Sequence, residues 1–452
     1  MTKIVLIGAG SAQFGYGTLG EVLASEVLQD CELVLHDINA EALDRVYQAG
    51  KAFIEAEKLA CRLSATVDRK VALEGAEFVV ISIEVGDRFA LWDQDRTVPQ
   101  QYGIHQVFGE NGGPGGLFHA LRIIPPILAI CEDVRTICDQ ATVFNYSNPM
   151  SRICTTVHRA FPDLRFVGLC HEIASLERYL PPMLKVPFEE LELRAAGLNH
   201  FSCLLEARYK SSGQDAYPDI RARAHEFFSA VPGSSDHLQH YLDTGKTFDT
   251  EGSHTMNPEL SRAARDWTER GLFKFVLEQF DLLPITTDSH FGEYLGWAYE
   301  VVDHKGIMDF YRYYRSCLCT AEPRIERTIK ERLVPIMAGI LTDQGFEEPA
   351  VNLPNQSYLR ELPSGIAVEV PGIIGKSGVR GVSVAPLPKA YAALLQNQVG
   401  IHEMTAEAVL TRSRKAAAQA LLVDPVVDRA VCARELVDVM ISLQPQFLGY
   451  LS

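Results

Sequence analysis

Two short stretches in the middle of the chain carry side chains that could bind a metal. Cys170 ends the apolar run RFVGLC with His171 next to it, and Asn199 and His200 interrupt the β-rich segment LRAAGLNHFSCLLEARY. A thiolate and an imidazole are common ligands of divalent transition-metal cations, and two protein ligands leave positions open, as a catalytic metal requires. Because a lone Cys/His pair more often belongs to a packed core, the pair alone also allows a structural interpretation.

A glycine-rich turn near the N-terminus indicates a dinucleotide site. The β-rich run KIVLIGAG ends with Gly8 and Gly10, which Ser11 follows and which fit the first two positions of GxGxxG. Gly8 would allow the tight turn, and Gly10 would let a pyrophosphate approach the backbone at a helix N-terminus. The third glycine is replaced by Gln13, so a merely structural turn is the alternative for the glycines alone. Asp37, which ends the next β-rich run, could bind the adenosine ribose hydroxyls and favours NAD over NADP.

Polar residues follow a later predicted strand that should end near the nicotinamide. The segment FNYSNPMSRICTTVHR places Asn145 and Asn148 after the apolar run ATVF. These asparagines could contact the cofactor or sugar hydroxyls, or they could simply form a turn and cap a helix.

The elements that would position these side chains alternate along the first part of the chain. Short apolar runs such as KIVLI, CELVLHDI, FVVISIEVG and RFVGLC are separated by amphipathic helical segments, one of them with Asn39 as a plausible N-cap. This pattern predicts a parallel sheet covered by helices on both faces. We therefore expect a Rossmann-like, doubly wound NAD-binding domain over residues 1–190 and a mixed α+β domain that binds substrate and metal over residues 191–452.

Composition narrows the class of partner. The net charge of −16 argues against nucleic acid or an anionic membrane, because both require a basic surface. No apolar run long enough to span a bilayer is evident, and none of the ten cysteines forms a CxxC pair. These features predict a cytoplasmic protein with reduced cysteines that acts on a small molecule.

The order of four motifs, GAGS, NPM, GLCH and GLNH, resembles that of glycoside hydrolase family 4, whose members are NAD- and metal-dependent glycosidases. LLPITTDSHFGEYLGW is similar to the GDxHxxEF segment of that family, and VNLPNQSYLRELPSGIAVEVP to its late substrate-domain block. The resemblance covers most of the chain. The CHEI form of the cysteine motif looks most similar to the α-galacturonidase members.

The resemblance implies the cofactors and the reaction. Cys170 and His200 would bind manganese or another divalent metal. NAD would take a hydride from carbon 3 of the sugar, and the metal would act as Lewis acid for the enediolate formed when a base removes the proton on carbon 2. Elimination of the aglycone, addition of water and return of the hydride would follow, in place of the usual chemistry of two carboxylates.

The resemblance also implies residue roles. Asp288 matches the acid of the GDxHxxEF block, where the family places a general base, although it could instead be a helix N-cap. His290 and Glu293 of that block should lie close by. His171 stands where some members carry a general acid and could protonate a leaving oxygen or contact substrate.

Substrate contacts are expected from Asn148, Asn199 and His290. Arg122 and Arg152 are candidates for a uronate carboxylate, which a planar guanidinium suits.

The expected function is cleavage of α-galacturonides derived from pectin. The alternatives are α-glucosides, α-galactosides or α-glucuronides as substrates, or an NAD-dependent dehydrogenase of a hydroxy acid, which would accumulate NADH. The resemblance implies a homodimer or homotetramer.

Overall fold

The N-terminal part of the protein alternates strands and helices. The computed structural model describes residues 1–11, 14–170, 172–228, 239–240, 242–245, 271–302 and 323–452. Its first elements are β1 (Lys3–Ile7), α1 (Phe14–Ala24), β2 (Glu32–His36), α2 (Ala40–Glu57), β3 (Arg62–Thr66), α3 (Arg69–Leu73), β4 (Phe78–Ile81), α4 (Arg88–Gln101), α5 (Gly113–Ile137), β5 (Thr142–Asn145), α6 (Met150–Ala160), β6 (Phe166–Gly168) and α7 (Ala174–Leu184). Neighbouring strands in the order β3-β2-β1-β4-β5-β6 are all parallel. That is the strand order of doubly wound dinucleotide-binding sheets, so the predicted Rossmann-like fold is confirmed.

Strand β1 shows why these apolar runs form buried parallel strands. Ile4 and Leu6 face the core formed with α1 and α2, while Val5 and Ile7 face the core formed with α5 and α6. Both faces of the sheet are covered, which demands an apolar residue at every position rather than alternation. The edge strand β3 escaped the sequence prediction, because its residues RLSAT are mostly part-exposed and show no apolar run.

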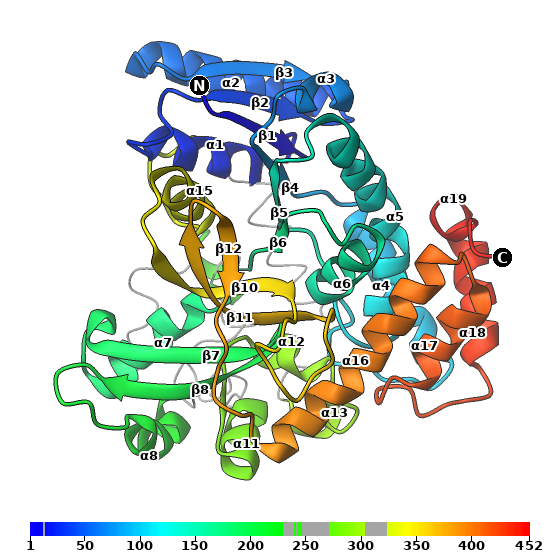
Figure 1. Ribbon diagram of the computed structural model, residues 1–452. Helices are drawn as coiled ribbons and strands as arrows, with labels where there is room; N and C mark the ends of the chain where they lie inside the picture. Colours follow the sequence, from blue (N-terminus) through cyan, green and yellow to red (C-terminus); the bar gives the residue numbers. More distant parts are fainter. Residues whose placement is uncertain (12–13, 171, 229–238, 241, 246–270, 303–322) are drawn as a thin grey trace.

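The C-terminal part extends the same sheet with antiparallel strands (Figure 1). Its elements are η1 (Phe188–Glu190), β7 (Leu191–Leu198), β8 (Phe201–Tyr209), α8 (Tyr217–Phe228), α11 (Gly271–Phe280), β9 (Leu283–Pro284), α12 (Asp288–Gly292), α13 (Ala298–Val301), α15 (Leu333–Thr342), β10 (Phe346–Pro354), β11 (Ala367–Gly375), β12 (Gly378–Gly381), α16 (Lys389–Leu410), α17 (Arg414–Leu422), α18 (Ala433–Leu443) and α19 (Pro445–Leu448). Strand β10 joins the parallel half through the pair Asn352–Gly168, and β11, β7, β8 and β9 follow in order. The mixed α+β character is confirmed. The division at residues 190/191 stays a prediction, because one sheet continues across it.

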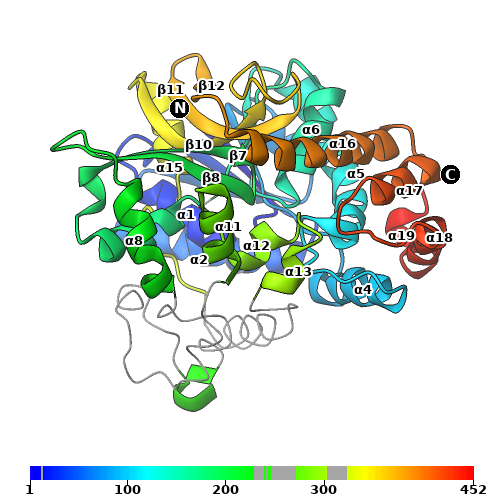
Figure 2. The ribbon, with the colours of Figure 1, turned by 90° about the horizontal axis from the view of Figure 1, so that it is seen from below.

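The helices of the C-terminal part fall into two groups. Helices α8, α11 and α12 pack on the antiparallel strands, and α16 and α17 pack on α5 and α6 (Figures 1 and 2). The segment AEAVLTRSRKAAAQALL, expected as one helix, forms the end of α16 and all of α17. Arg412 has a φ of 57°, and Ser413 caps α17 by accepting the Ala416 N–H, so the chain turns between the two helices.

Helix α5 forms the buried centre on this side of the sheet. Although it holds no long uninterrupted apolar run, its length and overall apolar composition meet the criterion for a membrane-spanning helix among the described residues. However, 78% of the apolar stretch of α5 that meets this criterion is buried within the fold, as in the core helix of a globular protein. The criterion therefore gives no evidence for a membrane.

Arg122 on α5 is held by a buried ion pair. Its two terminal nitrogens donate to both carboxylate oxygens of Asp95 on α4, at 2.8 and 2.6 Å, and one of them also donates to Gln444. The side chains of Asp95 and Arg122 are 0% and 3% exposed. Burial raises the pKa of Asp95 and the Arg122 charge opposes that rise. The pair fixes α4 to α5 and engages both terminal nitrogens of Arg122, and the expected role of Arg122 in binding a substrate carboxylate stays a prediction.

Arg152 on α6 likewise belongs to the scaffold. Its guanidinium donates to the Asn111 carbonyl oxygen at 3.1 Å and to Thr405 at 2.8 Å, and it lies 3.8 Å from the Asp424 carboxylate. Burial raises the pKa of Asp424 to about 6, against the opposing charge of Arg152. The Arg152 side chain is 1% exposed, and its expected role in binding a substrate carboxylate also stays a prediction.

Replacing Asp95 with asparagine should lower the free energy of unfolding by about 3 kcal/mol, because the buried Arg122 guanidinium loses its counter-charge. The matched control is Glu132→Gln, which removes the charge from a surface pair with Arg135 whose side chains are 49% and 59% exposed. That change should remove less than about 1 kcal/mol. Urea unfolding followed by circular dichroism measures both, and equal losses would show that the buried pair does not stabilise the helix packing.

Candidate active site

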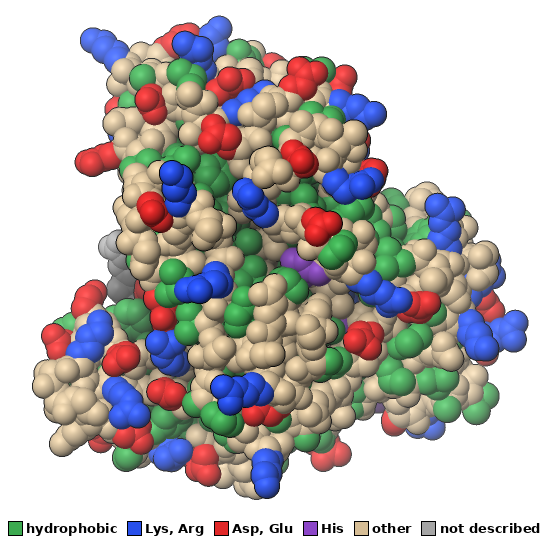
Figure 3. Space-filling view, viewed as in Figure 1, with side chains coloured by type: hydrophobic (Ala, Val, Ile, Leu, Met, Phe, Trp, Pro, Cys, Tyr) green, Lys and Arg blue, Asp and Glu red, His purple; other side chains and the backbone are tan. Residues whose placement is uncertain are grey.

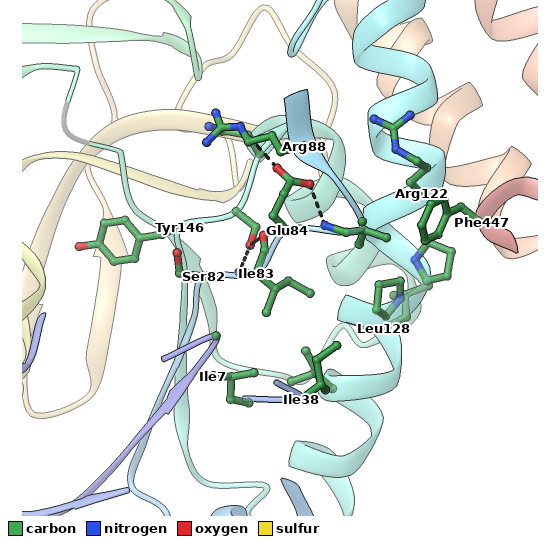
Figure 4. Close-up of a pocket in the computed structure, with 18 of the residues that line it drawn as sticks. Ile7, Ile38, Ser82, Ile83, Glu84, Arg88, Arg122, Leu128, Tyr146 and Phe447 are labelled. Atoms are coloured by element: carbon green, nitrogen blue, oxygen red, sulfur yellow. Dashed lines mark hydrogen bonds and ion pairs between the residues drawn. The ribbon is translucent and has the colours of Figure 1, made fainter. Parts of the chain in front are cut away.

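A cavity of about 1150 Å³ lies beyond the carboxyl ends of the parallel strands. Ligands of open α/β sheets bind at this edge, where the strand order reverses. Figure 4 shows Ile7 and Ile38 on one side of the cavity and Glu84 and Arg88 on the opposite side, with α5 and Phe447 forming a third wall. The polar residues that line it include Gly8, Ser11, Asp37, Ser82, Glu84, Arg88, Glu110, Arg122, Ser147 and Asn148.

The glycine turn has the geometry that the sequence predicted, with a different third glycine. Gly8 has a φ of 91°, and a Cβ there would lie 2.0 Å from the Ser82 carbonyl oxygen. Gly15, in the first turn of α1, approaches the backbone equally closely, because a Cβ would lie 2.0 Å from the Ala9 carbonyl oxygen. Gly15 therefore allows the helix to pack on the turn, two residues after the position where the fingerprint has its last glycine.

Asp37 lies at the end of β2, on the wall of the cavity. Its carboxylate accepts hydrogen bonds from the Gly10 and Asn39 N–H groups, both at 2.8 Å. Gly10 is thus turned toward Asp37, and a Cβ at that position would lie 2.8 Å from the carboxylate. Ser11 also lines the cavity, and its hydroxyl oxygen accepts the Phe14 N–H at the start of α1. Asp37 and Ser11 are placed as a nucleotide site requires.

The two asparagines after β5 have different environments. Asn145 donates to the Ser147 carbonyl oxygen at 2.9 Å and also accepts the Ser147 N–H, so its amide shapes the turn and it is not part of the cavity wall. Asn148 does line the cavity, and its Oδ1 is buried and has no hydrogen-bond partner among the described residues. Buried acceptors are normally satisfied, so Asn148 is suited to a ligand donor, whereas Asn145 supports the turn.

Cys170, Glu172 and His200 converge near the end of β6. Their candidate ligand atoms all lie within 4.8 Å of one another, with Cys170 Sγ 3.5 Å and a Glu172 oxygen 3.4 Å from His200 Nε2. Burial, followed by the charges of Glu172 and Glu369, raises the pKa of the Cys170 thiol well above its usual range. A buried sulfur, imidazole and carboxylate pointing at one place fit a divalent cation of intermediate softness.

His200 is held in an unusual backbone conformation. Asn199 and His200 form the entire loop between β7 and β8, whose strands close with the pair Leu198–Phe201. Such short hairpin loops require a positive φ, and His200 has a φ of 64°. The Asn199 side chain anchors the loop by donating to Glu369 at 2.8 Å, and the Asn199 N–H donates to Ser151 at 3.1 Å. Asn199 therefore positions His200. Asn199 itself lies next to the cluster of Cys170, Glu172 and His200.

His290 bridges two buried carboxylates next to the cluster formed by Cys170, Glu172 and His200. Its ring stacks on that of His200, with centroids 4.3 Å apart. Nδ1 lies 2.7 Å from Glu172, and Nε2 lies 3.4 Å from Glu110. Burial alone would lower the pKa of His290, but the hydrogen bonds to Glu110 and Glu172 raise it well above its usual value. The raised pKa favours a protonated imidazole between the two carboxylates.

Glu110 connects this cluster with the cavity. One of its oxygens lies 3.4 Å from His290, the other accepts a hydrogen bond from Arg88 at 2.9 Å, and both Glu110 and Arg88 line the cavity. Glu293 fixes the Glu110 loop by accepting the Glu110 and Asn111 N–H groups at 2.8 Å. Burial raises the pKa of Glu293 to about 7, with the His290 charge opposing the rise.

Two predicted catalytic residues are less directly placed. Asp288 is the first residue of α12 and is buried, and one of its carboxylate oxygens accepts the Leu272 N–H at the start of α11, at 3.3 Å. The N-cap of α12 is Thr287, so the alternative of Asp288 as that cap is wrong. His171 lies outside the described residues. The roles of general base and general acid both remain predictions.

Sequence reasoning missed Glu172 and Glu110. Glu172 was part of the quoted CHEI motif, and its spacing of two from Cys170 was the available signal. Glu110 stands in the glycine-rich segment FGENGGPGG, which carries no local signal for a buried carboxylate. Only tertiary contacts link these two residues to His290.

Comparisons with known proteins show the family of this chain. The model of the family 4 glycosyl hydrolases matches residues 3–186, and that of the family 4 glycosyl hydrolase C-terminal domain matches residues 195–427. The chain is 59% identical to an α-glucosidase of Erwinia rhapontici, over 100% of this chain and 99% of that protein. It is 28% identical to an α-galacturonidase of Bacillus subtilis, over 94% and 93% of the two chains.

Solved structures share the fold. A 6-phospho-α-glucosidase from gut microorganisms, in complex with NAD and Mn²⁺, superposes with a TM-score of 0.75 at 20% identity, over 98% of both chains. A 6-phospho-β-glucosidase from Thermotoga maritima, with manganese, NAD⁺ and glucose 6-phosphate, gives a TM-score of 0.74 at 19% identity, over 99% of both chains. With two family models covering most of its length, the chain belongs to the family 4 glycosyl hydrolases.

Proposed function

We propose that this protein hydrolyses α-glucosides and uses NAD and a divalent cation such as Mn²⁺. The observation that carries the proposal is the link between the two sites: Glu110 lines the dinucleotide cavity and also contacts His290, whose ring stacks on His200 of the Cys170–Glu172–His200 cluster. A sugar bound between them would face both cofactors. The 59% identity with an α-glucosidase supports the choice of sugar.

Residues of this chain would hold both cofactors. Gly8, Ser11 and Asp37 would bind the adenosine and pyrophosphate part of NAD, and Cys170 and His200 would bind the cation. When bound, NAD supplies a reversible hydride acceptor and the cation a Lewis acid for the sugar oxygens.

The proton-transfer groups follow from the described contacts and from the family resemblance. His290 holds a proton between Glu110 and Glu172, next to the proposed sugar position. Asn148 Oδ1 offers an unsatisfied acceptor to a cofactor amide or a sugar hydroxyl. Asp288 as base and His171 as acid complete the proposal.

The electrostatics of the described residues favour a neutral sugar over a uronate. Glu110 and Glu172 are buried, and Arg88 of the cavity wall already contacts Glu110 at 2.9 Å and Glu84 at 3.8 Å. Arg122 and Arg152, the candidates for a uronate carboxylate, are paired inside the scaffold. The carboxylate of a uronate would therefore lie near the acidic side chains among these residues, which weakens the galacturonide prediction. On the face shown in Figure 3, acidic and basic side chains are interspersed, so no broad positive surface would attract one.

The first experiment compares p-nitrophenyl α-glucoside with the α-galactoside, α-glucuronide and α-galacturonide, using reduced enzyme with NAD and Mn²⁺. We expect kcat/KM for the glucoside to exceed that for each uronide by at least about tenfold, or about 1.4 kcal/mol in transition-state binding. Release of p-nitrophenol should stop when NAD or Mn²⁺ is omitted, and absorbance at 340 nm should show no net NADH. Preference for the galacturonide would overturn the proposed substrate, and steady NADH formation without p-nitrophenol would indicate the dehydrogenase.

The glycine turn provides a test of the cofactor site. Gly8→Ala should raise the Kd for NAD by at least about tenfold, because the new Cβ would displace the turn from Ser82. Gly17→Ala is the matched control, since a Cβ at this exposed position in α1 meets no atom within 4 Å. Calorimetric titration with NAD measures both variants. Unchanged affinity in Gly8→Ala would place the dinucleotide elsewhere.

A further inference from the structure

Glu172 stands directly between the proposed metal ligands and α12. It follows β6, two residues after Cys170, and its side chain is 8% exposed. One carboxylate oxygen, Oε1, accepts hydrogen bonds from Thr286 and from His290 Nδ1 and lies 3.4 Å from His200 Nε2. This oxygen is well satisfied by the protein.

The second oxygen of Glu172 is not satisfied in this way. Oε2 is buried and has no hydrogen-bond partner within the described structure. A buried carboxylate oxygen without a partner is costly in the interior of a protein, so the position of Oε2 favours a ligand.

The distances within the cluster suit one cation. Ligand atoms that neighbour each other around a transition metal, at about 2.1 to 2.3 Å from it, are separated by roughly 3.1 to 3.6 Å. Cys170 Sγ and His200 Nε2 are 3.5 Å apart, and Glu172 Oε1, which shares its carboxylate with the unsatisfied Oε2, is 3.4 Å from His200 Nε2. One candidate ligand atom from each of the three side chains lies within 4.8 Å of the other two, which is close enough for all three to reach one cation.

We propose that Glu172 is a third protein ligand of the divalent cation, completing a Cys170–Glu172–His200 face whose remaining positions are open to sugar hydroxyls and water. The inference rests on the proposed function, because it assigns a ligand to the cation proposed there. Glu172 also carries charge: with the Cys170 thiolate it neutralises a dication, so a neutral sugar can bind without a further counter-ion.

The competing explanation is that Glu172 only orients His200 and His290 through hydrogen bonds. Such an orienting carboxylate would also lower metal affinity when removed, by about 10- to 100-fold, so affinity alone does not distinguish the two roles. The number of water molecules on the bound cation distinguishes the two roles. A lost protein ligand is replaced by a water molecule on the cation, whereas a lost hydrogen bond is not.

The test uses full-length reduced protein with Mn²⁺ alone, without NAD or sugar. The variants are Glu172→Ala, the isosteric Glu172→Gln, and Thr286→Val as a matched control that removes a hydrogen bond to Glu172 but no ligand. The Kd comes from the paramagnetic resonance signal of free Mn²⁺, and bound water is counted by nuclear double resonance in ¹⁷O-water. Circular dichroism checks that each variant is folded.

We expect Glu172→Ala and Glu172→Gln to raise the Kd for Mn²⁺ by at least about tenfold. Glu172→Ala should add one water ligand, and Thr286→Val should leave the water count unchanged. Unchanged affinity, or weaker affinity with an unchanged water count in Glu172→Ala, would overturn the assignment while leaving the proposed function intact. Wild-type protein that binds no Mn²⁺ would overturn both.

Discussion

The His290 imidazole, held between Glu110 and Glu172, is the contact on which the arrangement of the site depends. Glu110 comes from the loop before α5, Glu172 follows the last parallel strand, and His290 belongs to α12 in the antiparallel half. Separately, each carboxylate would be an expensive buried charge, and the imidazole would tend to lose its proton. Together they compensate one another, and this compensation links the parallel and antiparallel halves of the sheet at the cavity.

Two further guanidinium groups, those of Arg122 and Arg152, also lie beside buried carboxylates. Arg122 is neutralised by Asp95, and Arg152 lies beside Asp424, both in buried positions on α5 and α6. These helices pack against α16 and α17 and form the wall behind the cavity. Both guanidinium groups are thus paired within the protein.

Close backbone approach determines the shape of the dinucleotide side. At Gly8 the turn lies against the backbone that follows β4, and at Gly15 helix α1 lies against the backbone of the turn. Both contacts are too close to leave room for a side chain. On the other side of the cavity, the hairpin loop at His200 adopts a left-handed backbone and is anchored through Asn199 to Glu369. The close contacts at Gly8 and Gly15 and the left-handed backbone at His200 thus restrict the conformation of these segments.

The sequence by itself determined the features that depend on neighbouring residues: the apolar parallel strands, the Asn39 cap, the glycine turn with Asp37, and the Cys170 and His200 motifs. Local conformational preference and short-range spacing encode these features directly. Tertiary structure alone decided that Glu110, Glu172 and His290 meet, that Gly15 takes the packing role of the missing third glycine, and that Arg122 and Arg152 belong to the scaffold. Whether a charged side chain binds a ligand or a distant partner depends on which segments the fold brings together, and local sequence carries no record of that pairing.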